Sequence, residues 1–170
     1  MSETVLITYA TRYGSTKEVA EKIGEVIRNK GKVVDVIPCS QVDSLEKYQL
    51  IVIGAPFFVG KILKDAKTFM LKFKNQLPLK KVAIFALGPL GDDEKYITET
   101  TLQLEAELSK FPWLNPVSTA LFGGKYDPKN LNFFDNLLTK PSASPLHGLE
   151  MIDFRNWDAI TKWAEELPIA

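Results

Sequence analysis

The chain alternates short apolar runs with longer segments in which apolar residues recur every three or four positions. The short runs have strand length, and one of them, Leu50–Gly54, lacks the polar alternation of a half-exposed strand. This run therefore indicates a strand covered on both faces. The five predicted strands are Val5–Tyr9, Val33–Ile37, Leu50–Gly54, Val82–Ala86 and Val117–Phe122.

The longer segments predict helices between the strands. The first follows the capping-box pattern Ser15-Thr16-Lys17-Glu18, which places its start at Ser15, and Gly31 ends it after Asn29. Its inward face carries Val19, Ile23, Val26 and Ile27. Further helices are predicted around Ala66–Phe73, over Ile97–Leu108, and from Phe154 to Leu167 with Trp157, Ile160, Ala164 and Leu167 inward.

Strands that alternate with helices predict an α/β three-layer sandwich with a parallel sheet. For five strands the common order is 2-1-3-4-5. A length of 170 residues suits a single domain spanning residues 1–170. One irregular stretch extends from Gly123 to Met151, contains an apolar helix candidate at Leu131–Leu138, and continues into a Pro- and Ser-rich loop. Such a long connection is often functional.

Composition narrows the class of protein further. Basic and acidic residues number 21 each, so the net charge gives no sign of a nucleic-acid surface. The single cysteine, Cys39, excludes an internal disulfide and fits a reducing compartment. We see no signal peptide and no apolar segment of membrane-spanning length, so we expect a cytoplasmic protein, with peripheral membrane contact left open.

In an open parallel sheet, ligands bind beyond the carboxyl ends of the strands at the switch point of the strand order. Here that point lies between strands one and three. The loop after strand one carries three hydroxyl side chains, an arginine, a tyrosine and a glycine directly before a helix. These residues are Thr11, Arg12, Tyr13, Gly14, Ser15 and Thr16. They suit a phosphate held at a helix N-terminus, although Ser15 and Thr16 alone would also serve as plain helix caps.

The run from Ile7 to Ala20 resembles the FMN phosphate loop of flavodoxins. Its Thr-Arg-x-Gly-x-Thr form is similar to that of the flavodoxin-like group that includes quinone-dependent protoporphyrinogen dehydrogenase. The likeness also covers Ile51–Ala55 with Gly60, the stretch Gly88–Asp92, and Asp153–Trp157. The resemblance implies a flavodoxin-like fold, FMN as cofactor and an electron-transfer function.

A flavin ring needs a flat apolar wall and backbone groups at its polar edge. The loops after strands three and four are therefore expected to supply Pro56, Phe57, Phe58, Val59, Gly60, Gly88, Pro89, Leu90 and Gly91. Phe57 or Phe58 would form the wall, and one of the two belongs to the core. Typical flavodoxins carry Tyr or Trp in a loop flanking the ring, whereas this chain has Leu90 in the third loop.

The number and spacing of the glycines exclude two other classes of phosphate-binding loop. A P-loop needs four residues between its glycines, but five separate Gly54 from Gly60, and Ile62 follows Lys61. A dinucleotide-binding Rossmann loop needs three glycines after strand one, and only Gly14 is present. No His, Cys and carboxylate cluster suggests a metal site.

Two function classes stay open on the sequence alone. One is a flavin oxidoreductase acting on a quinone- or porphyrin-type small molecule or a redox partner protein, which the long segment 123–151 favours. The other is a diffusible electron carrier without enzymatic activity. No side-chain acid or base stands out, so the flavin itself would carry the chemistry.

Overall fold

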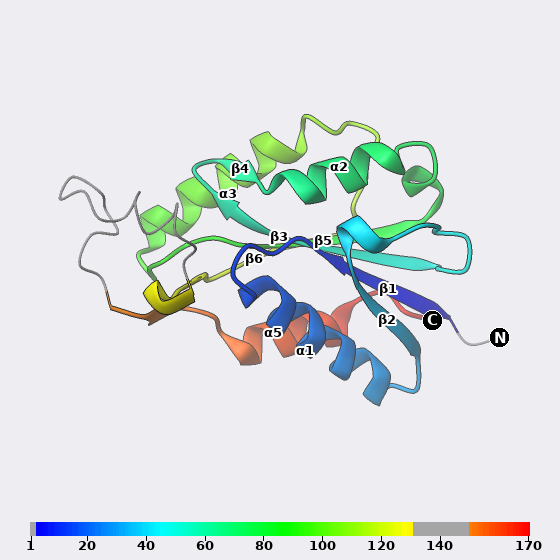
Figure 1. The fold of residues 1–170 in the computed structure, drawn as a ribbon, viewed down its shortest axis with the longest axis horizontal. Helices are drawn as coiled ribbons and strands as arrows, with labels where there is room; N and C mark the ends of the chain where they lie inside the picture. The colour runs from blue at the N-terminus through cyan, green and yellow to red at the C-terminus, as the bar shows by residue number, and fades with distance from the viewer. Residues whose placement is uncertain (1–2, 131–149) are drawn as a thin grey trace.

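The computed structural model describes residues 3–130 and 150–170, and its centre is a parallel sheet. The parallel strands are β1 (Thr4–Tyr9), β2 (Val33–Pro38), β3 (Leu50–Phe58), β5 (Lys81–Leu87) and β6 (Ser118–Phe122). They lie in the order β2-β1-β3-β5-β6 (Figure 1), which confirms the predicted topology.

A further strand corrects the expectation of five. β3 continues to Phe58, four residues beyond the predicted end, and β4 (Lys61–Ile62) returns antiparallel to it. Ala55 and Pro56 still pair with β5 in the parallel sheet, so the strand extends through residues that the sequence assigned to a loop. The second of the three expected loops is therefore a hairpin.

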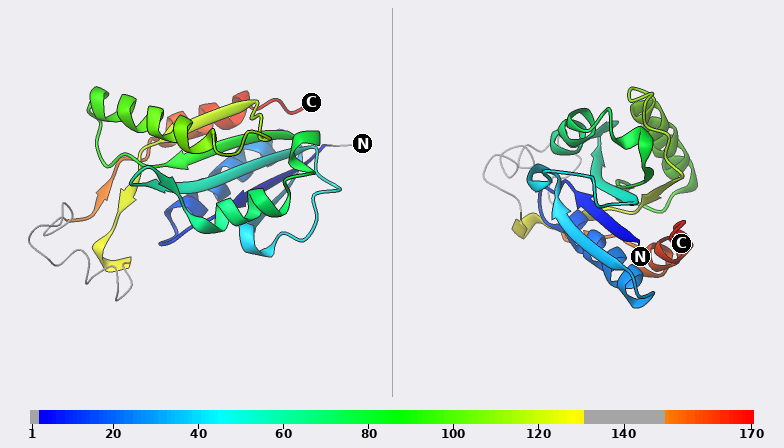
Figure 2. Two further views of the ribbon diagram at one scale, coloured as in Figure 1. Left: turned by 90° about the horizontal axis from the view of Figure 1, so that it is seen from above. Right: turned by 90° about the vertical axis from the view of Figure 1, so that its right-hand side faces the viewer.

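Helices cover both faces of the sheet, as Figures 1 and 2 show. α1 (Ser15–Asn29) and α5 (Trp157–Glu166) lie on one face, and α2 (Lys64–Lys72) and α3 (Glu94–Leu108) lie on the other. The predicted inward residues of α1 are all buried, because its apolar positions recur at the helical period. Short 3-10 turns η1 (Cys39–Gln41) and η2 (Leu77–Leu79) follow β2 and α2. A third, η3 (Pro128–Asn130), follows the short strand β7 (Lys125–Tyr126).

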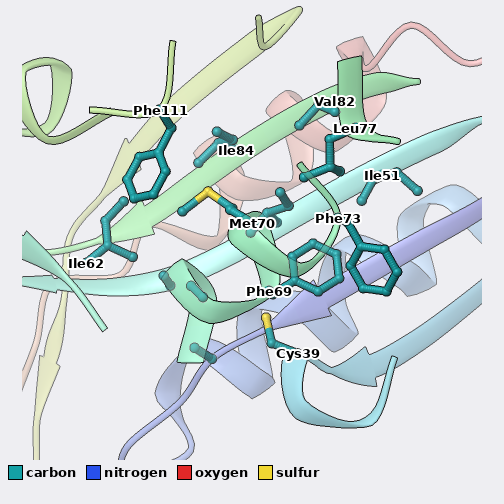
Figure 3. Close-up of a cluster of buried hydrophobic side chains, with 14 of the residues drawn as sticks. Cys39, Ile51, Ile62, Phe69, Met70, Phe73, Leu77, Val82, Ile84 and Phe111 are labelled. Atoms are coloured by element: carbon teal, nitrogen blue, oxygen red, sulfur yellow. The ribbon is translucent and has the colours of Figure 1, made fainter. Parts of the chain in front are cut away.

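The sheet separates two apolar cores. In the core beneath α2 and α3 (Figure 3), Phe69, Met70 and Phe73 pack against the sheet, and the thiol of Cys39 is buried beside them. Burial raises the pKa of Cys39 to about 11, although its sulfur accepts a hydrogen bond from Thr8 Oγ1 at 3.4 Å. Cys39 is thus the small buried residue that the sequence predicted.

The last helix begins later than predicted. Asn156 caps it by accepting a hydrogen bond from the N–H of Ala159 at 3.0 Å, so α5 starts at Trp157 and not at Phe154. Trp157 is 37% exposed, which corrects its inward assignment, and its ring lies against the guanidinium of Arg155. Ile160, Ala164 and Leu167 are buried as expected.

The ends of the long segment form an antiparallel ribbon outside the main sheet. β7 (Lys125–Tyr126) pairs with β8 (Ile152–Asp153), and we call this ribbon with its flanking residues 123–126 and 152–155 the stem. The predicted helix 131–138 and the Pro- and Ser-rich loop lie outside the described residues. The chain termini lie at the opposite edge of the sheet (Figure 1). Within the part of the chain that is described, no helix is long and apolar enough to cross a membrane.

Candidate functional site

The structure brings the three predicted loops together at the carboxyl edge of the sheet. The N–H of Ala10 donates to the carbonyl of Gly54 at 2.9 Å, which joins the first loop to β3. Pro56 lies opposite Leu87 in the β3–β5 register, so the hairpin and the third loop leave the sheet side by side. These loops flank the point where the strand order reverses, the usual ligand position in this architecture.

The first loop leaves the N-terminus of α1 open. Gly14 is the N-cap, with φ of 92°, and no side chain caps the helix. The helix start at Ser15 is confirmed, but the capping-box interpretation of Ser15 and Glu18 is wrong. Glu18 instead forms an ion pair with Arg155, at 2.6 Å, across the stem. The backbone N–H groups of the first turn therefore remain available to an anion.

One hydroxyl of this loop has no partner in the protein. The side chain of Thr16 is fully buried, and its Oγ1 makes no hydrogen bond. Thr11 has a different role, because its Oγ1 accepts a hydrogen bond from the N–H of Gly14 at 2.9 Å and shapes the turn. A buried hydroxyl without a partner costs free energy unless a ligand satisfies it. The residues thus fit an anionic group such as a phosphate at the start of α1.

The remaining first-loop residues surround this position. Arg12 is exposed, and its guanidinium carbon lies 5.7 Å from the centroid of the half-buried Tyr13 ring. Ser15 is half-buried at the first helical position. Arg12 therefore carries an exposed positive charge two residues before the N-cap Gly14.

The hairpin at the other end of the site has a strained turn. Phe58 pairs with Lys61, and the two residues between them, Val59 and Gly60, have φ of 49° and 70°. The tight two-residue turn of an antiparallel hairpin requires both of its residues to be left-handed, and Asn-Gly is the preferred pair there. Val59 is the only non-glycine residue with positive φ in ranges 3–130 and 150–170. A β-branched residue in this conformation is strained, and strain of this kind clusters at functional sites.

The two phenylalanines of the hairpin divide as the sequence predicted. Phe57 is 4% exposed and belongs to the core beneath α2 and α3, whereas Phe58 is 65% exposed. Val59 is also exposed, at 78%. Phe58 is therefore the ring that is free to contact a ligand, and the hairpin tip presents an apolar surface.

A buried carboxylate fixes the base of the hairpin. Glu107 of α3 accepts a hydrogen bond from the N–H of Ile62 at 3.3 Å, and its other oxygen lies 2.5 Å from Lys110 Nζ. Lys67 of α2 pairs with the same carboxylate, whose side chain is fully buried. Burial raises the pKa of Glu107, but the hydrogen bonds from Lys110, Lys67 and Ile62 outweigh it and lower the pKa to about 2.

Backbone hydrogen bonds fix the third loop to the end of β6 and to the stem. Gly88 donates its N–H to the carbonyl of Phe122 at 3.1 Å, and the carbonyl of Pro89 accepts from the N–H of Gly124 at 2.8 Å. Leu90 and Gly91 are half-buried, and the side of Gly91 where a Cβ would project faces the Tyr96 ring. The backbone of this loop is thus fixed close to the hairpin.

Sequence reasoning did not assign roles to Glu107 and Arg155. Glu107 follows Leu104 by three positions and so lies on the buried face of α3. A carboxylate on an apolar helix face indicates a buried, paired charge, and this was the signal that could have found it. Arg155 occurs in the stretch 153–157 that resembles the family, but its partner Glu18 is 137 residues away. No group of three or more potential metal ligands occurs among the described residues.

Taken together, the fold and the site define an open α/β domain with an uncapped helix start at its switch point and an apolar hairpin beside it. Comparison with known proteins identifies the family. The sequence profile of the flavodoxin domain matches residues 6–144, which is most of the chain. The chain therefore belongs to the flavodoxin domain family.

Individual relatives agree with this assignment. The protoporphyrinogen IX dehydrogenase [quinone] of Escherichia coli (strain K12) is 22% identical over 169 residues, covering 95% of this chain and 93% of that protein. Oxidised flavodoxin 1 from Bacillus cereus superposes with a TM-score of 0.55 at 18% identity, covering 96% of each chain. The rubredoxin oxygen:oxidoreductase of Desulfovibrio gigas gives a TM-score of 0.53 at 16% identity, covering 95% of this chain and 34% of that one. The structural matches show a shared flavodoxin-like fold.

Proposed function

We propose that this protein binds FMN and acts as an oxidoreductase. It passes electrons from a donor to a quinone- or porphyrin-type small molecule or to a redox partner protein. The observation that carries the proposal is the open N-terminus of α1 at the switch point, with the buried, partnerless hydroxyl of Thr16 inside it. Family membership supports a flavin as the ligand that fills this position.

The residues divide between the two ends of the cofactor. Thr16 and Ser15 would donate hydrogen bonds to the phosphate, together with the first-turn N–H groups of α1, and Thr11 and Gly14 shape the loop. Arg12 and Tyr13 flank it. At the ring end, the hairpin residues 56–60 and the third-loop residues 88–91, which follow the paired residues Pro56 and Leu87, would hold the flavin.

The chemistry that FMN supplies when bound is reversible one- and two-electron transfer at its ring. The protein's part is to orient the ring and set its polar surroundings. The exposed Phe58 would offer the ring an aromatic surface, and Leu90 stands in the third loop where typical flavodoxins carry an aromatic residue in a ring-flanking loop. The backbone at Gly60 and Gly91 would allow a close approach to the ring because neither residue has a side chain.

The acceptor class rests on the E. coli relative, which is named as a quinone-dependent protoporphyrinogen IX dehydrogenase and covers almost the whole chain. A second candidate, a diffusible carrier, is favoured by the exposed apolar tip of Phe58 and Val59. An apolar patch of this kind suits docking of a protein beside the ring.

Reduction of the purified flavoprotein separates these possibilities. The chain reconstituted with FMN should show flavin absorbance bands, and after chemical reduction under anaerobic conditions it should be reoxidised rapidly by a soluble quinone. Slow reoxidation by quinones, with fast electron exchange to a redox protein, would favour the carrier. Absence of flavin bands after reconstitution would contradict the proposal as a whole.

A further inference from the structure

The stem places one arginine against the first turn of α1. The side chain of Arg155 is 4% exposed, and its Nη1 donates to Glu18 Oε2 at 2.6 Å and to the carbonyl of Ser15 at 3.4 Å. Its Nη2 and Nε bind both oxygens of Asp153, at 2.8 and 3.0 Å. Lys125, from the other strand of the stem, lies 3.9 Å from the second oxygen of Glu18. Two cations of the stem therefore hold the one carboxylate in the first turn of α1.

The position of Glu18 matters because of what surrounds it. A carboxylate in the first turn is attracted to the free N–H groups of the helix start, and Glu18 is the acidic residue of that turn. A carboxylate so placed would occupy the donors that a phosphate needs and would repel its charge. In the structure Glu18 points to Arg155, and no side chain caps α1.

The stem is well placed to hold Arg155 still. The N–H of Phe154 donates to the carbonyl of Gly124 at 2.9 Å, and the N–H of Gly124 donates to Pro89 in the third loop at 2.8 Å. A Cβ on Gly124 would lie only 2.8 Å from the carbonyl oxygen of Gly88, so stem and loop pack backbone against backbone. One continuous set of contacts thus runs from the third loop through the stem to the phosphate loop.

We propose that Arg155 is a positioning residue for the phosphate end of the FMN site, acting by holding the Glu18 carboxylate away from the N–H groups of α1. This inference rests on the proposed function. It assigns to the stem of the segment after β6 a part in cofactor recognition. Arg155 acts through Glu18, so its effect is confined to ligands that carry the phosphate.

The test compares the affinities of FMN and riboflavin, measured by quenching of flavin fluorescence on titration with the apoprotein. Arg155→Gln should weaken FMN binding about tenfold and leave riboflavin binding within about twofold of wild type. Adding Glu18→Gln should restore most of the FMN affinity, because the competing charge is gone. The single variant Glu18→Gln provides the reference for this double-mutant cycle.

Arg28→Gln is the matched control. Arg28 is in the last turn of the same helix and donates to the carbonyl of Val34 at 3.0 Å, far from the phosphate loop. It should change neither affinity. If Arg155→Gln does not fold, Arg155→Lys applies the same criterion, since lysine cannot reach Glu18 and Asp153 with the same set of donors.

The outcomes are distinct. Equal losses for FMN and riboflavin, or no rescue by Glu18→Gln, would overturn the role of Arg155 while leaving FMN binding by the wild type intact. A wild-type protein that does not prefer FMN over riboflavin would instead contradict the proposed function on which the inference rests.

Discussion

The two ends of the candidate site are built in opposite ways. At the phosphate end, the donors are backbone groups and hydroxyls within a few residues of one another, and Thr16 is fully buried. At the ring end, the hairpin tip is apolar and exposed, and its turn holds Val59 in a strained conformation. The comparison shows that the donors at the start of α1 come from adjacent residues, although the distant Arg155 holds Glu18 beside them, whereas the hairpin is anchored by distant elements such as Glu107.

The strongest expected contrast lies within the hairpin itself. Phe57→Ala removes a buried ring from the core and should lower the free energy of unfolding by about 3–5 kcal/mol. Phe58→Ala removes an exposed ring, so stability should change by less than about 1 kcal/mol while the flavin spectrum or reduction potential shifts. Urea denaturation and spectroelectrochemistry measure the two effects. An unchanged spectrum and potential for Phe58→Ala would place the aromatic wall elsewhere.

The next effect concerns the anchoring of the hairpin. The pKa of Glu107 is lowered from 4.5 to about 2, so its ionised form stabilises the folded state. The stabilisation, about 3 kcal/mol, is complete above the unfolded pKa and is lost as the pH falls from about 4.5 towards 2. Urea denaturation of wild type and Glu107→Gln at pH 7, 4 and 2.5 measures it. The stability difference between them should shrink across this window, and a constant difference would contradict the anchoring role.

At the phosphate end, one substitution should have opposite effects on stability and binding. Thr16→Val keeps the shape of the side chain and removes a buried hydroxyl without a partner, so the apoprotein should gain about 1–3 kcal/mol. FMN binding should weaken about tenfold or more, because a hydrogen bond to a charged phosphate is lost. Thermal unfolding of the apoprotein and FMN titration give the two values. If Thr16 had only a structural role, Thr16→Val would destabilise the apoprotein and leave its affinity for FMN unchanged.

The smallest effect concerns the strained turn. Val59→Asn creates Asn-Gly, the pair preferred where both turn residues are left-handed, and should stabilise the protein by about 1 kcal/mol. Val117→Asn is the control, since Val117 is also an exposed valine, at 54%, but has no positive φ. Denaturant unfolding compares the variants. Equal effects at both positions would show that the turn carries no strain.

The same contrast explains what the sequence could predict. The strand order and the start of α1 at Ser15 could be predicted from hydrophobic runs and from adjacent residues, both of which are local signals. The hairpin was missed because the apolar run appeared to end at Gly54, while pairing of Pro56 with Leu87 extends β3. The capping-box prediction was wrong because Glu18 binds Arg155, which is 137 residues away in the sequence. Tertiary contacts of this kind override local propensity and leave no periodic trace.

The most direct test of the account is the affinity of the wild-type apoprotein for FMN against riboflavin at equal ionic strength. Both ligands share the ring and differ in the phosphate, so the ratio of their dissociation constants isolates the contribution of the α1 N-terminus. We expect FMN to bind at least about tenfold more tightly than riboflavin. Equal affinities would contradict the assignment of a phosphate to the open helix start and the buried hydroxyl of Thr16.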